Sequence, residues 1–162
     1  MKKSRKLFHF LAALVFLLLG VAECQEKTRE AYEQMSYDQI RSRLTDLAQK
    51  FPSVMLLENS KSKVGVPYLV DCDDKGNKCV LDIVTITDFK TSSENKVQVY
   101  ISGSLQGNER LGPVITVNLI EYLVSNFKKD VTITYLLQTR EIIITPMTNA
   151  YGYAKKTLKE LT

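Results

Sequence analysis

Few side chains in this sequence could act as catalytic groups, because the chain contains a single histidine, His9. Imidazole is the usual general base at neutral pH and the commonest nitrogen ligand of zinc. His9 lies in an apolar segment close to the N-terminus. The rest of this sequence therefore cannot by itself form a Ser-His-Asp triad, a Cys-His dyad or a histidine-containing zinc site.

The remaining candidates are carboxylates and one serine. Asp73 and Asp74 are adjacent, but they lie in a polar turn where solvated charges are ordinary, so we do not expect catalysis there. Ser104 resembles the serine of a nucleophile elbow only superficially, because it is second and not central in its motif and lacks a general base. Glu109 precedes an apolar helical stretch, and a carboxylate at the start of a helix favours the helix dipole whatever the function.

Two cysteines, Cys72 and Cys79, bracket a polar turn of six residues that has Gly76 near its centre. In an oxidising compartment two cysteines across such a loop are expected to form a disulfide. The alternative is a pair of free thiols on a mobile loop. A zinc site at this loop would need further ligands, and no histidine is present to supply them.

The N-terminal residues have the pattern of a secretory signal peptide over residues 1–24. A basic stretch, Lys2–Lys6, precedes the apolar run Leu7–Gly20, and the small residues Ala22 and Cys24 fit a cleavage site. We therefore expect a secreted protein with no stable membrane association after cleavage. An uncleaved membrane anchor is the alternative, although a span needs about 20 apolar residues and this run is shorter.

Composition limits the classes of protein further. The chain of 162 residues is 44% hydrophobic and 25% charged, which excludes a wholly disordered, collagen-like or polytopic membrane protein. The leader holds four of the 22 basic residues and one of the 18 acidic residues, so residues 25–162 carry a net charge of only +1. We therefore expect no nucleic-acid partner. The length fits one domain.

Hydrophobic periodicity predicts alternating helices and strands after a loose polar segment at residues 25–35. Ser36 and Gln39 form a capping-box pattern ahead of an amphipathic stretch that Pro52 ends. The predicted helices are 36–51, 113–127 and 132–139, and the predicted strands are 54–58, 66–71, 79–87, 97–102 and 142–145. Tyr151–Tyr153 is expected to be a turn, and the aromatic residues Tyr122, Phe127 and Tyr135 are expected in the core.

This order of elements predicts an α/β fold, a layered mixed β-sheet with flanking helices. The loop at residues 103–112 follows a strand and precedes a helix. Loops at the carboxyl ends of strands are where α/β sheets place their functional groups. This loop is therefore the candidate site.

Three segments resemble the zinc metallocarboxypeptidases of the carboxypeptidase A type. Val99–Glu109 is similar to that family's zinc-binding loop, which carries His-x-x-Glu, often as His-Gly-Asn-Glu. Ile143–Tyr153 resembles the next strand and the Pro-x-x-Asn-x-x-Gly-Tyr turn. Ser36–Phe51 resembles the opening helix. The segments occur in the family's order, so the resemblance covers about residues 36–158 and implies the amino-terminal half of the carboxypeptidase fold.

The resemblance implies zinc as the cofactor, peptides as substrates and hydrolysis of C-terminal residues as the reaction. Glu109 stands at a zinc-ligand position, but Gln106 stands where the family has its zinc histidine. The family's second histidine, Asn-Arg pair, tyrosine and general-base glutamate lie further along than this sequence extends. We therefore expect residues 36–162 to form a partial carboxypeptidase-like domain that binds no zinc tightly and is inactive.

Other hypotheses remain open at this point. The chain could be a secreted non-enzymatic binding protein on the same scaffold, or a fragment of an active full-length carboxypeptidase. It could also be a small membrane-anchored or interaction protein that keeps its leader.

Overall fold

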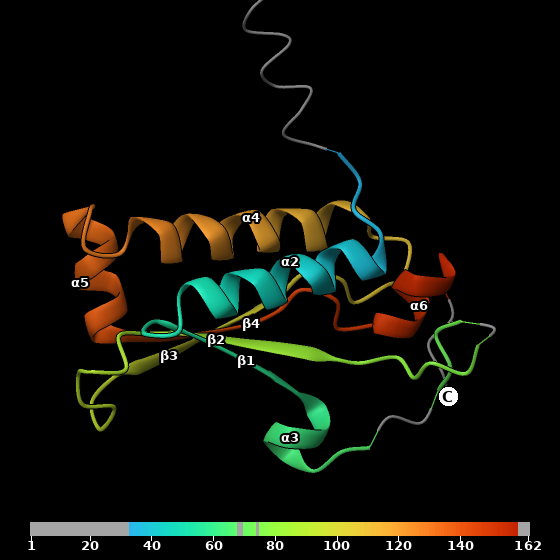
Figure 1. Cartoon of the computed structure of the whole chain (residues 1–162), viewed down its shortest axis with the longest axis horizontal. Coiled ribbons are helices and arrows are strands. Elements are labelled where there is room, and N and C mark those ends of the chain that lie inside the picture. Colours follow the sequence, from blue (N-terminus) through green and yellow to red (C-terminus); the bar gives the residue numbers. More distant parts are fainter. Residues whose placement is uncertain (1–32, 68–69, 74, 159–162) are drawn as a thin grey trace, which may run out of the picture. The chain divides into compact units, whose positions relative to one another are not determined.

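The computed structural model describes residues 33–67, 70–73 and 75–158 (Figure 1). The chain divides into residues 1–33 and a compact unit, Gln34–Thr162, and the description below concerns that second unit. The predicted signal peptide and most of the predicted loose segment lie outside the described residues.

Four strands form one mixed sheet in the order β1-β2-β4-β3. The two pairs β1–β2 and β2–β4 are antiparallel, whereas β3 and β4 are parallel. The strands are β1 (Met55–Asn59), β2 (Asp82–Ile86), β3 (Val97–Ser102) and β4 (Arg140–Thr145). This mixed sheet with flanking helices confirms the predicted fold class.

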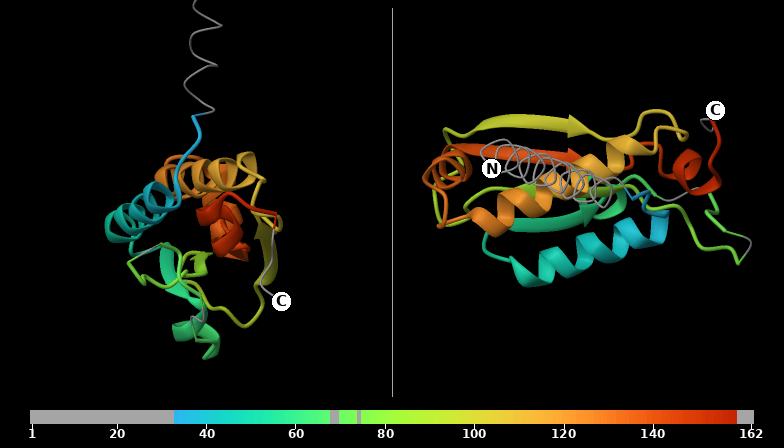
Figure 2. Two further views of the ribbon diagram at one scale, coloured as in Figure 1. Left: turned by 90° about the vertical axis from the view of Figure 1, so that its right-hand side faces the viewer. Right: turned by 90° about the horizontal axis from the view of Figure 1, so that it is seen from above.

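The two long helices, α2 (Tyr37–Lys50) and α4 (Leu111–Asn126), lie side by side on one face of the sheet (Figures 1 and 2). The predicted capping box is present at α2, where the Ser36 hydroxyl accepts the Gln39 N–H and the Gln39 side chain accepts the Ser36 N–H. The other helices of the described residues are short, namely α3 (Ser60–Val64), α5 (Val131–Thr139) and α6 (Ala150–Lys155).

The core lies between the sheet and the two long helices, α2 and α4. Alternate residues of β2 and β4 face α2 and α4, since side chains of a strand alternate between faces. Each such side chain, when fully buried, contributes about 1.5–3 kcal/mol. The fully buried residues of this core include Ile40 and Leu44 of α2, Val84 and Ile86 of β2, Ile120 of α4 and Ile144 of β4.

The structure corrects the prediction of a strand at Val66–Asp71. The described residues of that segment make only an isolated bridge between Asp71 and Lys78. The short helix α3 precedes this segment and ends at Gly65, which has the left-handed conformation with φ of 73°. Val66 is 52% exposed, so this residue buries little surface against the sheet.

The predicted turn at Tyr151–Tyr153 is also wrong, because these residues belong to α6. The Asn149 side chain accepts the Gly152 N–H at 2.7 Å and caps that helix. Two of the aromatic residues expected in the core are exposed: Tyr122 by 55% and Tyr135 by 65%. Phe127 does pack against the core.

Candidate functional site

The candidate loop, residues 103–110, joins the carboxyl end of β3 to the start of α4. Because β3 and β4 are parallel, their carboxyl ends lie next to each other at the same end of the strands. The Gly103 N–H donates to the Thr145 carbonyl at 3.0 Å, and the Asn149 N–H donates to the Ser104 carbonyl at 2.9 Å. The loop is thus attached to the segment that follows β4.

Close backbone contacts require glycine in this region, notably at positions 107 and 112. A Cβ atom on Gly107 would lie 2.1 Å from the Gly152 carbonyl carbon of α6, and one on Gly112 would lie 1.5 Å from the Gly103 carbonyl oxygen. Any larger side chain would push the loop away from α6 or from the end of β3. The path of the loop therefore depends on these two glycines.

Glu109 uses its carboxylate inside the loop. Its Oε2 atom accepts the backbone N–H groups of Leu105 at 2.9 Å and Gln106 at 3.0 Å. The Glu109 N–H in turn donates to the Gln106 carbonyl, and the buried Ser104 hydroxyl donates to the same carbonyl at 2.8 Å. Because α4 begins at Leu111, Glu109 lies before the helix and not in its first turn.

The loop thus brings Gln106 and Glu109 together, but these two residues do not fit a catalytic zinc ion. Such sites usually have three protein ligands, and this pair offers one neutral amide and one carboxylate whose Oε2 already accepts two N–H groups. Among residues 33–67, 70–73 and 75–158, no group of three or more His, Cys, Asp or Glu side chains could hold a metal ion.

Arg110 anchors the loop to both ends of the described chain, a role that the sequence did not reveal. Its guanidinium lies 3.5 Å from the centre of the Tyr153 ring, and Nη1 donates to the Tyr153 carbonyl at 2.6 Å. The buried Tyr153 hydroxyl donates to the Met35 carbonyl at 2.7 Å, so Tyr153 links Met35 to the loop. Burial raises the pKa of Tyr153, and the charge of Arg110 partly offsets this.

Cys72 and Cys79 form a disulfide with a Cα–Cα distance of 4.7 Å. Inside their loop the Asp73 carboxylate accepts N–H groups from Asn77 and Lys75. These hydrogen bonds, chiefly the one from the Asn77 side chain, lower the pKa of Asp73. Asp73 therefore stabilises the turn, and Asp74 lies outside the described residues.

A hollow of about 660 Å³ lies where the N-terminal end of α2 meets this disulfide loop and Ala154 of α6. Two basic side chains line it. Arg41 pairs with Asp82 at 2.8 Å and Lys78 pairs with Asp71 at 2.7 Å, so both are engaged in ion pairs.

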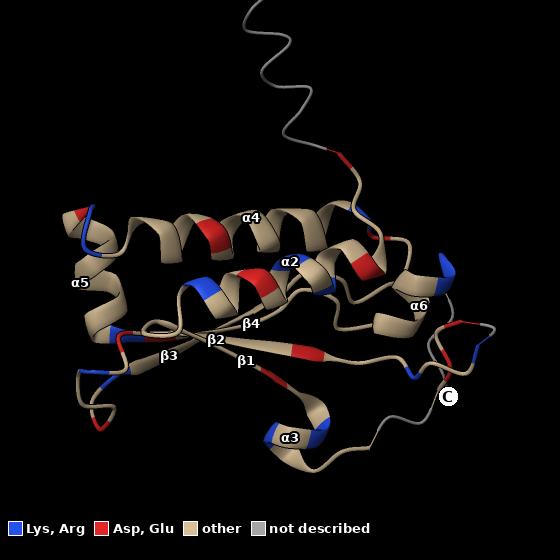
Figure 3. Ribbon diagram, viewed as in Figure 1, with Lys and Arg blue, Asp and Glu red and all other residues tan. Residues whose placement is uncertain are grey.

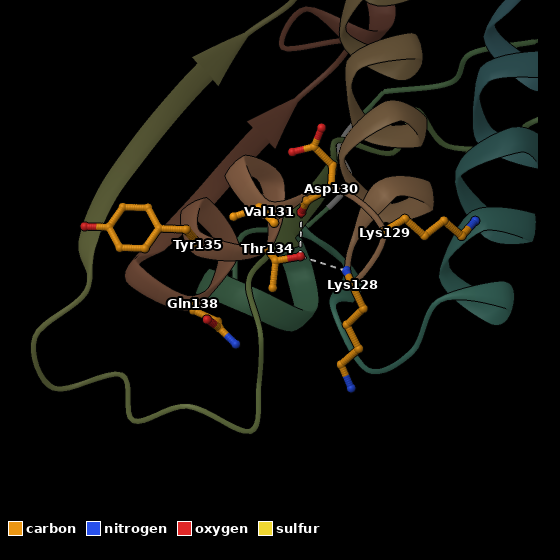
Figure 4. A pocket seen from close by; sticks show the side chains of 7 residues that line it. All are labelled: Lys128, Lys129, Asp130, Val131, Thr134, Tyr135 and Gln138. Carbon is orange, nitrogen blue, oxygen red and sulfur yellow. Dashed lines mark hydrogen bonds between the residues drawn. The ribbon is translucent and has the colours of Figure 1, made fainter.

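A second, shallow hollow of about 530 Å³ lies at the turn between α4 and α5 (Figure 4). Thr134 organises this turn: its hydroxyl oxygen accepts the Lys128 N–H at 2.9 Å and donates to the Asp130 carbonyl at 2.7 Å. The polar groups of this turn therefore hydrogen-bond to the backbone. The hollow lies at the C-terminal end of α4, whereas the candidate loop lies at the N-terminal end of that helix.

Comparison with known proteins identifies the family of this scaffold. Residues 40–160 match the family model described as zinc carboxypeptidase. Carboxypeptidase D of Anas platyrhynchos is 45% identical over 53 residues, which is 33% of this chain and 4% of that protein. Carboxypeptidase M of Mus musculus is 34% identical over 68 residues, which is 40% of this chain and 15% of that protein.

Solved structures give the same fold. The crystal structure of thrombin activatable fibrinolysis inhibitor matches 82% of this chain and 31% of that chain, with a TM-score of 0.58 and 16% identity. Carboxypeptidase A from Helicoverpa armigera matches 78% of this chain and 28% of that one, with a TM-score of 0.57 and 21% identity.

The chain therefore belongs to the zinc carboxypeptidase family. It spans less than a third of the length of each of these relatives, and its fold corresponds to part of theirs. Among the residues described here, no helix is long and apolar enough to cross a membrane.

Proposed function

We propose that this chain is a secreted carboxypeptidase-like domain that has lost the family's metal chemistry. The proposal is supported by the loop: Glu109 is hydrogen-bonded to the backbone N–H groups of Leu105 and Gln106, and by its resemblance to the family motif the loop has Gln106 where the zinc histidine is expected. Hydrolysis of C-terminal residues from peptides is the reaction of the family from which the scaffold descends, and it is not proposed for this chain.

The physical reason is the number and type of ligands. A neutral amide is a much weaker zinc ligand than imidazole, and one carboxylate alone holds the ion no better than a surface acidic group. Without bound zinc there is no water with a pKa lowered to about 7 and no Lewis acid for a peptide carbonyl. The chain is expected to release no amino acid from a peptide.

Gln106 also helps to choose among the hypotheses. A longer protein that supplied the family's later residues would still have glutamine at the first ligand position, which disfavours a fragment of an active enzyme. The loop is nevertheless held in place by Gly107 against α6 and by Arg110 against Tyr153. A maintained scaffold without its metal ligands supports a non-enzymatic binding protein as the form of this proposal.

Zinc binding tests the proposal directly. The purified chain should retain no stoichiometric zinc after dialysis against a weak chelator, and it should release no C-terminal residue from a model peptide. Gln106→His should bind zinc more tightly than the chain itself, yet remain inactive, because it supplies only two of three ligands.

Gln138→His is the matched control, since Gln138 is exposed on α5, far along the chain from the loop. Equal zinc affinity of the two histidine variants would mean that position 106 is not the ligand position. Stoichiometric zinc in the unmodified chain, or metal-dependent peptide cleavage, would contradict the proposal.

Secretion has its own test. The basic n-region and short apolar run predict cleavage between Ala22 and Glu26 during expression in a secretory host. Intact mass of protein from the medium should give an N-terminus in that range. A secreted product that starts at Met1 would contradict the cleavage, and a product held in membranes would support the anchored alternative.

A further inference from the structure

Helix α6 and its N-cap support the candidate loop at three points. Loop residues spaced three apart each contact this helix or its cap: Ser104, Gly107 and Arg110. Their partners, in the same order, are Asn149, Gly152 and Tyr153. The position of α6 therefore determines the path of the loop.

Helix α6 needs tertiary contacts, because it has only six residues. Isolated helices shorter than about 12–15 residues are marginal in water. The buried anchor of α6 is Tyr153, which is fully buried and lies with its ring against the Arg110 guanidinium. A buried hydroxyl needs a hydrogen-bond partner, and that of Tyr153 donates to the Met35 carbonyl at 2.7 Å.

Met35 reaches the loop from the opposite end of the domain sequence. It directly precedes Ser36, the N-cap of α2, and its side chain packs partly buried against the core. Its carbonyl accepts a second, longer hydrogen bond at 3.5 Å from Nη2 of Arg110. Met35, Arg110 and Tyr153 thus form a closed set, in which each residue contacts the other two.

We propose that Met35, Arg110 and Tyr153 form a clamp through which the segment before α2 controls the order of the candidate loop. With the clamp closed, α6 is held against the loop. When Met35 is removed, the Tyr153 hydroxyl loses its acceptor, α6 loosens and the loop opens locally. The clamp uses neither Gln106 nor the Glu109 carboxylate, so it does not depend on the proposed loss of zinc chemistry.

Hydrolysis of the peptide bond between Met35 and Ser36 would open the clamp for two reasons. The carbonyl acceptor leaves with the N-terminal piece, and a buried hydroxyl without a partner is costly. The Ser36 nitrogen, which belongs to the same peptide group, becomes an ammonium group beside the Arg110 guanidinium. Figure 3 shows basic residues at the C-terminal end of α6 and no acidic residue in that helix to neutralise the new charge.

Hydrogen exchange of the full chain tests the clamp. Tyr153→Phe removes only the hydroxyl and should raise the exchange rates of the Leu105 and Gln106 amides about tenfold, the usual order for one lost hydrogen bond. Exchange in the central strands β2 and β4 should stay unchanged. Tyr122→Phe, at an exposed tyrosine of α4, is the matched control and should alter neither set of amides.

Cutting the segment in place separates the clamp from a general folding defect. Replacement of Ala31–Met35 by Asp-Asp-Asp-Asp-Lys keeps a backbone carbonyl at position 35 and allows enteropeptidase to cut before Ser36. After the N-terminal piece is removed, the Leu105 and Gln106 amides should exchange about tenfold faster than in the uncut protein. The same cut should have a smaller effect in a protein that also carries Tyr153→Phe.

Three results would overturn the proposal. Equal exchange of the loop amides before and after the cut would show that Met35 does not hold the loop. Acceleration of β2 and β4 by the same factor would mean a loss of stability of the whole domain. An equally large effect of the cut in the Tyr153→Phe protein would show that the coupling does not run through Tyr153. None of these measurements involves zinc, so the clamp can fail while the proposed function stands.

Discussion

At the scale of single residues, the carboxylate of Glu109 has a local structural task in the loop. Its Oε2 atom holds two backbone N–H groups that would otherwise lack a partner in the loop. Arg110, its neighbour, fixes the other side of the same loop through Tyr153. The loop is therefore kept in shape by contacts that need no metal ion.

Glu109→Ala should accordingly destabilise the domain. The loss of two hydrogen bonds at a solvent-exposed loop is expected to lower the free energy of unfolding by about 0.5–1.5 kcal/mol, measured by urea denaturation. Glu109→Gln should cost less, because the amide oxygen can still accept an N–H.

Glu94→Ala is the control for this pair, since Glu94 is an exposed acidic residue in the loop before β3. It should change the free energy of unfolding by less than about 0.5 kcal/mol. Added zinc should shift the midpoint of none of these proteins, and a zinc-dependent shift that vanishes in Glu109→Ala would point to a metal-bound carboxylate.

At the scale of elements, an ion pair between Arg41 and Asp82 joins α2 to β2 at 2.8 Å. The Asp82 side chain is 7% exposed, whereas that of Arg41 is 39% exposed. Burial raises the pKa of Asp82, and the nearby Arg41 only partly offsets this effect. The connection therefore orients the helix on the sheet at the cost of burying a charge.

The sign of the pH dependence follows from that raised pKa. The folded state holds the Asp82 proton more tightly than the unfolded state does, so stability associated with Asp82 is present at low pH and is lost as pH rises through the folded pKa. Relative to Asp82→Asn, the unmodified chain should lose stability as pH rises above the ordinary carboxyl pKa of about 4. The measurement is urea denaturation of both proteins at each pH.

The opposite trend is equally informative. If the unmodified chain gains stability relative to Asp82→Asn as pH rises, the attraction of Arg41 outweighs burial. A parallel series with Asp38→Asn, at an exposed carboxylate in the first turn of α2, corrects for changes in surface charge.

The long elements were predictable because they follow one hydrophobic period over several turns. Ile40, Leu44 and Leu47 repeat at helical spacing after a capping box, and the structure confirms both features. The short helices α3 and α6 could not be predicted in this way, since five or six residues show no period. Their caps, Asn59 and Asn149, depend on side-chain hydrogen bonds that composition does not distinguish from those of a turn.

The loop between β3 and α4 was predictable in place, but its contacts were not. Its position follows from a strand that ends at Gly103 ahead of an apolar helix, and from the resemblance of residues 99–109 to a known loop. The contacts of Arg110 could not be predicted, because its partners Tyr153 and Met35 are 43 and 75 residues away in the sequence. Such long-range partners are determined by the packing of the whole domain.

At the scale of the whole domain, the described core lies on one face of α4. The helix is apolar almost throughout, yet only its sheet-facing side is buried: Ile120 is fully buried, whereas Leu111, Ile115 and Tyr122 are each about half exposed. A helix that is apolar all round is usually covered on all sides. Composition alone therefore predicts more burial for α4 than the fold provides.

This asymmetry predicts very different effects for two isoleucines on the same helix. Ile120→Ala should lower the free energy of unfolding by about 2–5 kcal/mol, because it leaves a cavity between α4 and the sheet. Ile115, 49% exposed, loses little buried surface, so Ile115→Ala should cost less than about 0.5 kcal/mol. Urea denaturation of the two variants under identical conditions measures both changes. Since the substitution and the helix are the same, differences in helix propensity cancel.

A large loss at Ile115 would show that the outer face of α4 is covered in solution, whereas a small loss at Ile120 would mean that α4 does not pack on the sheet as described.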